Sequence, residues 1–191
     1  MRILAIYKYY WPDTTPYARI LKAILEHWVA EGHECSVLTA QPGYNDIEHP
    51  PQPRRETIGG VRVDRLRIVR ERKRNPLTRL ASFLTFLGQA AWRACTGPRS
   101  DMIISSPHPP VLMGLTLRLI KRLRGIPYIY HCEDIHPESA LCTDQIRPGL
   151  GYRLLRRLDT ANCRDAGLVV TLSADMLGTL VDRGIDRRQI A

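Results

Sequence analysis

The sequence lacks the apolar segments that carry a chain into or across a membrane. No apolar run approaches the roughly 20 residues that span a bilayer, and the apolar stretch at residues 1–7 is too short for a signal peptide. The five cysteines include no C-x-x-C pair, and their odd number favours reduced thiols over a disulfide framework or a zinc site. These absences predict a cytoplasmic protein, with the inner face of the plasma membrane as an open alternative location.

Motifs that define several enzyme classes are also missing. The chain has neither G-x-G-x-x-G after its first predicted strand nor G-x-x-x-x-G-K-[ST], so the dinucleotide fingerprint and the P-loop are absent. The lack of a G-x-S-x-G elbow argues against an α/β-hydrolase. His131, Asp134 and His136 do not have the H-E-x-x-H spacing of a zinc-binding helix. We therefore expect neither a metal ion nor a bound cofactor.

The composition indicates a globular domain with an excess of positive charge. Of the 191 residues, 44% are hydrophobic and 25% are charged, which is enough for one domain with a sizeable core. The net charge of +9 predicts an anionic partner, either nucleic acid, acidic phospholipid or a phosphorylated substrate. Nucleic acid is the weakest of these, because no aromatic residues interleave with the basic stretch at 62–74. Contact with an anion or a membrane is expected at Arg70, Arg72, Lys73 and Arg74.

Short apolar strands alternate with amphipathic helices along the chain. Strands are predicted at 2–7, 33–39, 102–105, 126–130 and 167–171, with a hairpin across Gly59-Gly60. Helices are predicted at 16–31, 76–94, 110–124, 151–164 and 174–183, the first and last capped by Thr15 and Ser173. This order predicts a mainly parallel sheet covered on both faces. We expect one domain at residues 1–184, with 185–191 beginning a linker to a further domain.

The helix predicted at 76–94 has an apolar face made of Leu77, Leu80, Phe83, Leu84, Leu87 and Ala91. Packing of this face against the sheet is the preferred interpretation. Because the basic stretch precedes the helix, contact with an anionic membrane is the alternative.

Polar side chains gather where predicted strands end, which is where open α/β sheets bind ligands. The loop after residues 2–7 contains Trp11, Asp13, Thr14 and Thr15, and the loop after 102–105 contains His108. The stretch after 126–130 contains Asp134, His136, Glu138 and Ser139. For each loop a purely structural role remains open, and Glu138 and Ser139 also suit the start of a helix.

The side chains in these loops suit the handling of a hydroxylated or anionic substrate. An aromatic ring such as Trp11 stacks on a sugar or lipid, and the helix N-terminus after Thr15 favours an anion. Asp134 is expected to accept a hydrogen bond from a hydroxyl, and His108 to act as a base or to hold a hydroxyl. His131 and His136 are alternative bases.

Five short motifs follow one another along the chain. They are Tyr9-Tyr10-Trp11-Pro12-Asp13, Glu31-Gly32-His33-Glu34, Gln41-Pro42-Gly43-Tyr44, Ser105-Ser106-Pro107 and Asp134-Ile135-His136-Pro137-Glu138-Ser139. In this order they resemble the N-terminal half of family 4 retaining glycosyltransferases over essentially the whole chain. The last motif is similar to the family's D-L-W-P-E-S, with His136 in place of tryptophan. Thr14-Thr15-Pro16 stands where many members have a glycine-rich loop.

The resemblance implies a GT-B fold, in which two Rossmann-like domains face a cleft. This chain would be the acceptor-side domain, with three α/β/α layers. The other domain, which carries the family's E-x7-E motif, holds most of the nucleotide-sugar donor. Glu26 and Glu34 have that spacing, but they lie at a helix end and a strand start, so we interpret the match as accidental. We therefore expect the chain alone to be inactive without a C-terminal domain or partner subunit.

The implied activity is transfer of a hexose from a nucleotide sugar to a lipid-linked or glycan acceptor in exopolysaccharide or lipopolysaccharide synthesis. Asp134 and His108 are the candidate catalytic residues. The expected acceptor contacts are Trp11, Asp13, Thr14, Thr15, Tyr44, His136, Glu138 and Ser139. Two other interpretations remain open: a non-catalytic module that binds a partner or a membrane, and one half of a sugar-nucleotide epimerase.

Overall fold

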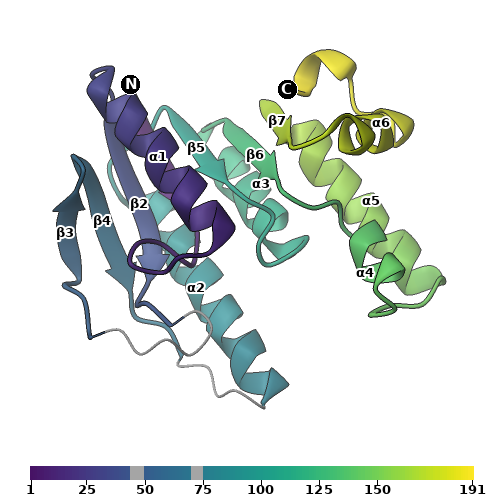
Figure 1. Cartoon of the computed structure of the whole chain (residues 1–191), viewed down its shortest axis with the longest axis horizontal. Coiled ribbons are helices and arrows are strands. Elements are labelled where there is room, and N and C mark those ends of the chain that lie inside the picture. Colours follow the sequence, from purple (N-terminus) through teal and green to yellow (C-terminus); the bar gives the residue numbers. More distant parts are fainter. Residues whose placement is uncertain (44–49, 70–74) are drawn as a thin grey trace. The chain divides into compact units, whose positions relative to one another are not determined.

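The alternation of strands and helices predicted from the sequence is confirmed by the computed structural model, which describes residues 1–43, 50–69 and 75–191 (Figure 1). The chain divides into two compact units, residues 1–103 and 104–191. The strand β5 (Met102–Ser105) runs from the first unit into the second.

The first unit contains a mainly parallel sheet. Its strands, in the order β3-β4-β2-β1, are Arg55–Ile58 (β3), Val61–Leu66 (β4), Glu34–Ala40 (β2) and Arg2–Ile6 (β1). The parallel register pairs Ile3 with Cys35 and Val37 with Val63. The antiparallel β3–β4 hairpin turns at Gly59-Gly60, where both glycines have the positive φ that such turns require. The predicted hairpin is therefore confirmed, although β3 begins within the segment expected to be a loop.

Helices α1 (Pro16–Ala30) and α2 (Pro76–Thr96) pack on opposite faces of this sheet (Figure 1). The predicted N-cap of α1 is confirmed, because the Thr15 hydroxyl accepts a hydrogen bond from the Ala18 amide at 3.0 Å. The first unit thus has the three layers that the sequence predicted.

The apolar face predicted to pack α2 on the sheet is only partly correct: Leu87 is buried, and Phe83 and Ala91 are half-buried. Leu77 is 72% exposed, and Leu80 and Leu84 are also exposed. Besides Leu87, the helix buries Ser82, Phe86, Ala90 and Ala94, which the predicted face did not include. Small side chains allow the close approach of helix to sheet, but hydrophobic periodicity ranks them below leucine.

The second unit is built on the parallel pair β6 (Tyr128–Cys132) and β7 (Leu168–Thr171). Its helices are α3 (Leu112–Arg124), α4 (Glu138–Cys142), α5 (Leu150–Asp165) and α6 (Ala174–Asp182). Helix α3 packs on β6 and on α5, and α6 packs on β7. Helix α3 starts two residues later than expected, because Val111 adopts a positive φ of 62° just before it.

The segment at 185–191 continues the second unit. Ile185 and Ile190 are buried, and Ile190 forms a parallel bridge with Val169. The Thr171 amide donates a hydrogen bond to the Ala191 carbonyl at 2.9 Å. These contacts extend the edge of β7, after the short 3-10 helix η2 (Arg187–Gln189).

Candidate functional site

The loop after β1 is held by contacts within the first unit. The Asp13 carboxylate is buried and accepts hydrogen bonds from the Gly43 amide at 3.2 and 3.4 Å. Thr15 is also buried and caps α1, whereas Thr14 is exposed and Trp11 is 43% exposed. Of the predicted acceptor contacts in this loop, Trp11 and Thr14 present surface to solvent, and Asp13 and Thr15 shape the backbone.

A buried arginine supports the Trp11 end of this loop. Arg65, near the end of β4, donates a hydrogen bond to the Trp11 carbonyl at 3.0 Å and forms an ion pair with Glu56. Its side chain is fully buried, and its Nε and Nη1 form no hydrogen bond with the described residues. On the outer side, the Lys22 ammonium lies 5.7 Å from the centre of the Trp11 ring. The indole is therefore fixed from both its backbone and its ring.

Several predicted contacts lie outside the described residues. These are the acceptor contact Tyr44 and the basic residues Arg70, Arg72, Lys73 and Arg74.

The His108 loop joins β5 to α3. Its backbone is tightly turned, because the His108 amide donates to the Ser106 carbonyl at 2.8 Å and the Met113 amide to the Pro109 carbonyl at 3.1 Å. Ser106 is buried, and His108 keeps partial exposure. The Nε2 atom of His108 is itself buried, so only part of the imidazole faces solvent.

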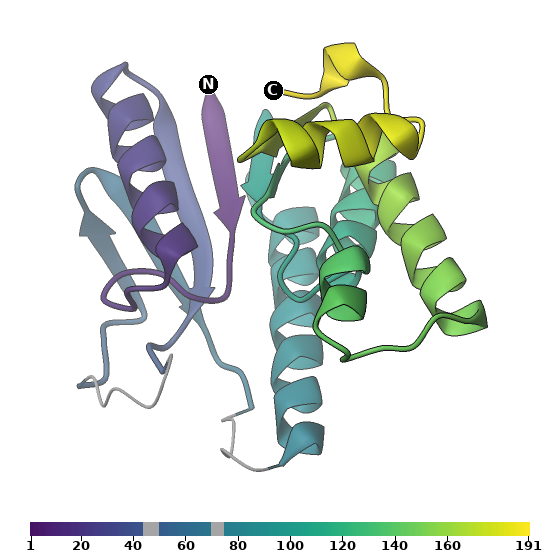
Figure 2. The same ribbon diagram turned by 45° about the vertical axis from the view of Figure 1, so that its right-hand side comes forward.

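The loop after β6 brings Asp134, His136 and Ser139 together. The Asp134 side chain is 56% exposed; one oxygen accepts a hydrogen bond from the Ile135 amide at 2.8 Å, and the other lies 3.7 Å from Nε2 of His136. Nδ1 of His136 lies 3.3 Å from the Ser139 hydroxyl. Figure 2 shows this loop running from β6 into α4. A carboxylate and an imidazole held side by side can bind and orient a hydroxyl group.

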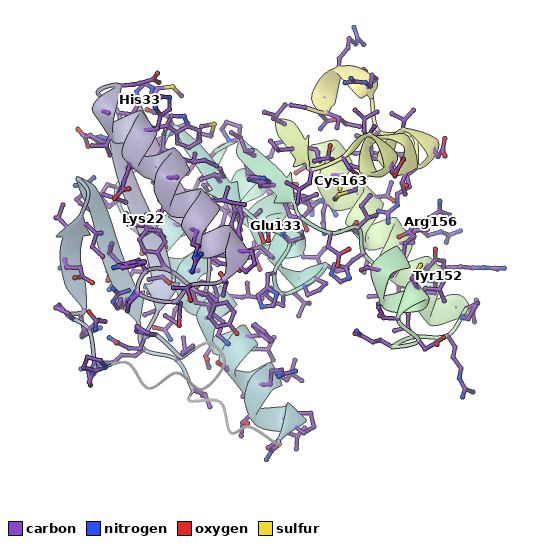
Figure 3. The ribbon with its side chains drawn as sticks, viewed as in Figure 1. Lys22, His33, Glu133, Tyr152, Arg156 and Cys163 are labelled. Atoms are coloured by element: carbon purple, nitrogen blue, oxygen red, sulfur yellow. The ribbon has the colours of Figure 1, made fainter. Side chains whose placement is uncertain are left out.

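Glu138 has a different environment from the other residues of its motif. Its carboxylate forms ion pairs with Arg183 and, at 3.2 Å, with Arg156. Arg156 lies on α5, where Figure 3 labels it. It also forms the first residue of α4, where a carboxylate is favourable to the helix dipole. The sequence left open that Glu138 and Ser139 begin a helix, and the structure shows that they are the first two residues of α4.

Sequence reasoning placed the end of β6 too early and so missed Glu133. The strand continues to Cys132, which buries His131 within it and puts Glu133 immediately after it (Figure 3). Burial raises the pKa of Glu133 to about 7 and lowers the pKa of His131. Glu133 has neither a hydrogen bond nor an ion pair within the described residues. A desolvated carboxyl group without a structural partner at a strand end is a candidate for binding or proton transfer.

The described part of the chain shows no metal-type cluster and no membrane span. Within these residues, no three His, Cys, Asp or Glu side chains converge as ligands. Of the described helices, none combines the length and apolar character needed to cross a bilayer.

The fold and the polar strand ends define a Rossmann-like α/β domain of the kind that forms half of a GT-B enzyme. A family model described as a glycosyl transferase 4-like domain matches residues 17–191. The chain belongs to this family, as its ordered motifs predicted. No protein of curated function matches it by sequence.

Solved structures share the fold at low identity. Sucrose-phosphate synthase from Thermosynechococcus elongatus is 13% identical with a TM-score of 0.67, over 100% of this chain and 47% of that one. HepE from Anabaena, solved with UDP-glucose, is 16% identical with a TM-score of 0.58, over 100% of this chain and 43% of that one. Trehalose 6-phosphate synthase from Burkholderia multivorans is 13% identical with a TM-score of 0.54, over 98% and 42%. This chain spans less than half the length of these structures.

Proposed function

We propose that the chain is the acceptor-binding N-terminal half of a retaining glycosyltransferase. The intact enzyme transfers a hexose from a nucleotide sugar to a lipid-linked or glycan acceptor in cell-surface polysaccharide synthesis. The observation that carries the proposal is the Asp134–His136–Ser139 group at the carboxyl end of β6, in a chain of the glycosyl transferase 4-like family. Solved structures that share the fold include one bound to UDP-glucose, which supports a nucleotide-sugar donor.

The proposed chemistry depends on positioning. The bond between the anomeric carbon and the diphosphate oxygen breaks as the acceptor oxygen attacks from the same face, and the acceptor proton passes to the departing diphosphate. Asp134 accepts a hydrogen bond from the acceptor hydroxyl, and His108 holds a second hydroxyl. In this proposal no metal takes part, the second domain or a partner subunit supplies the donor site, and this chain alone is inactive.

The test is turnover of the intact two-domain enzyme. Asp134→Asn and His108→Ala are each expected to lower kcat by about 10-fold or more, because positioned polar groups contribute at least this much. Asp182→Asn is the matched control, because Asp182 is an exposed carboxylate at the end of α6. If both variants keep kcat within about twofold of the control, the site is wrong. If the product is an epimerised nucleotide sugar, the epimerase interpretation replaces this one.

A second candidate function is attachment of the protein to the cytoplasmic face of a membrane through α2. Leu77, Leu80 and Leu84 form an exposed stripe, and Trp92 is 69% exposed further along the helix. Helix α2 contains no acidic residue, and the basic residues at 70–74 precede it in the sequence. An exposed apolar stripe on a helix that follows basic residues in the sequence suits an anionic bilayer.

Sedimentation with vesicles tests this attachment. The protein should sediment with phosphatidylserine vesicles and should dissociate from them at high salt. The variant with both Leu80→Glu and Leu84→Glu should no longer sediment with the vesicles. Leu119→Glu on α3 is the control, because Leu119 is an exposed leucine outside the stripe. Equal binding by all variants would exclude the α2 stripe.

A further inference from the structure

Arg183, which the sequence places directly after α6, is buried and contacts three separate parts of the second unit. Its Nη1 donates to Asp159 of α5 at 2.8 Å, and its Nε donates to Glu138 of α4 at 3.1 Å. Its Nη2 donates to the carbonyl of His136 at 2.7 Å and also to Glu138. Only 1% of its side chain is exposed. One planar guanidinium therefore ties α4, α5 and the loop after β6 together.

The charges around this guanidinium are balanced. Asp159 and Glu138 supply two carboxylates, and Arg156 supplies a second cation 3.2 Å from Glu138. Burial raises the pKa of Asp159, while its hydrogen bond with Arg183 opposes that shift. Replacing a buried ion cluster with apolar groups is often neutral for stability, so a cluster of this kind is best explained by the geometry it imposes.

The ion cluster around Arg183 holds the backbone of the candidate site in place. The carbonyl of His136 is fixed by Arg183, while the imidazole of the same residue lies between Asp134 and Ser139. Two residues later, Glu138 is fixed by the same guanidinium. The backbone between these two anchors has little freedom, which sets the direction of the imidazole and of Asp134 beside it.

We propose that Arg183 is the positioning residue of the loop at 134–139, and that Glu138 is its ligand rather than a contact of the acceptor. Only the expected effect of Arg183 on sugar transfer rests on the proposed function. The clamp itself is a property of the fold and can be measured without a substrate. Arg183 touches no reacting atom in this assignment.

The test uses Arg183→Lys in the intact protein, because lysine keeps the buried positive charge but cannot reach all three partners. Amide hydrogen exchange at 134–139 is expected to accelerate by about 10-fold or more, with exchange in β7 unchanged. In the transfer assay, kcat is expected to fall by about 10-fold to 100-fold while the KM for the nucleotide sugar stays within about twofold. Glu138→Gln keeps the shape of the ligand and should give the same pattern to a smaller degree.

Arg188→Lys is the control, because Arg188 is an arginine with a 90% exposed side chain five residues further on. It should change neither exchange nor kcat. Unchanged loop exchange in folded Arg183→Lys overturns the clamp, whatever the protein catalyses. Faster exchange with unchanged kcat overturns the positioning role. Failure of the unaltered enzyme to transfer sugar refutes the proposed function instead, and the exchange result still decides the clamp.

Discussion

Gly114, in the first turn of α3, is a position where one added methyl group should clash with a buried side chain. A Cβ built there lies 2.3 Å from Nδ2 and 2.4 Å from Cγ of Asn162. Asn162 is fully buried on α5, and its Nδ2 donates to the Val111 carbonyl at 3.0 Å. Because Gly114 has no side chain, α5 can approach α3 closely. Asn162 on α5 can then bind the carbonyl of Val111, the residue with positive φ that ends the His108 loop.

The cost of Gly114→Ala follows from these contacts. Overpacking in a core costs about 1–3 kcal/mol, and displacement of Asn162 leaves a buried carbonyl unpaired at a further cost of about 1–3 kcal/mol. The helix propensity of alanine returns about 1 kcal/mol. We expect a net loss of about 3 kcal/mol, which lowers Tm by about 6–12 °C in a chain of this length.

Thermal unfolding of four variants checks this prediction: Gly114→Ala, Gly88→Ala, Asn162→Ala and the double variant of Gly114 and Asn162. Gly88→Ala in α2 is the control, because a Cβ there meets no described atom within 4 Å and should raise stability by about 1 kcal/mol. In the double variant Gly114→Ala with Asn162→Ala the clashes with Nδ2 and Cγ are absent and only the 2.6 Å approach to the Cβ of residue 162 remains, so the combined loss should be smaller than the sum of the single losses by about 1 kcal/mol or more. Equal Tm values for Gly114→Ala and Gly88→Ala would refute the steric argument.

Three further predictions concern single side chains. The pKa of Glu133 rises from 4.5 to about 7 on folding, so the folded state loses stability as the pH rises through this window. Glu133→Gln should remove that loss. By urea unfolding, the variant should be more stable than the unaltered protein by about 1 kcal/mol at pH 8 and equally stable at pH 4. Arg65→Lys should lower the urea unfolding free energy by about 2 kcal/mol, because one ammonium cannot bond both Trp11 and Glu56 as the guanidinium does, whereas Arg62→Lys on the exposed side of the same strand should have no effect. Thr15→Ala should cost about 1 kcal/mol and Thr15→Ser much less, in thermal melts, because serine retains the cap to Ala18.

The parts of the fold that depend on local chemistry could be predicted from the sequence. The cap at Ser173, the Gly59-Gly60 hairpin and the helix stop at Gly125 each depend on a few neighbouring residues. Gly125 has a φ of 66°, the left-handed conformation that ends many helices and that glycine adopts without strain. Signals of this kind are complete within one short window of sequence.

The supports of the candidate site could not be found in this way. Arg183 lies 45 residues from Glu138 and 24 from Asp159, and an arginine at the end of a helix is common for reasons of the helix dipole alone. The burial of Asp13 likewise depends on Gly43, 30 residues away. The peptide bonds before Pro12, Pro109 and Pro137 are all cis. The sequence alone does not predict this, because the trans form before proline is favoured by only about 0.5–1 kcal/mol.

The two buried arginines address the same physical problem in their separate units. A loop at the end of a parallel strand has left the hydrogen-bond ladder, so its carbonyls need other donors and its polar side chains have no fixed direction. Arg65 donates to the carbonyl of Trp11 and pairs with Glu56, and Arg183 donates to the carbonyl of His136 and pairs with Glu138. In both cases the carboxylate stabilises the buried charge and the carbonyl contact fixes the loop. Under the proposed function, residues that never meet the substrate should therefore affect its turnover, because a transfer that depends on positioning is sensitive to displacements of about 1 Å.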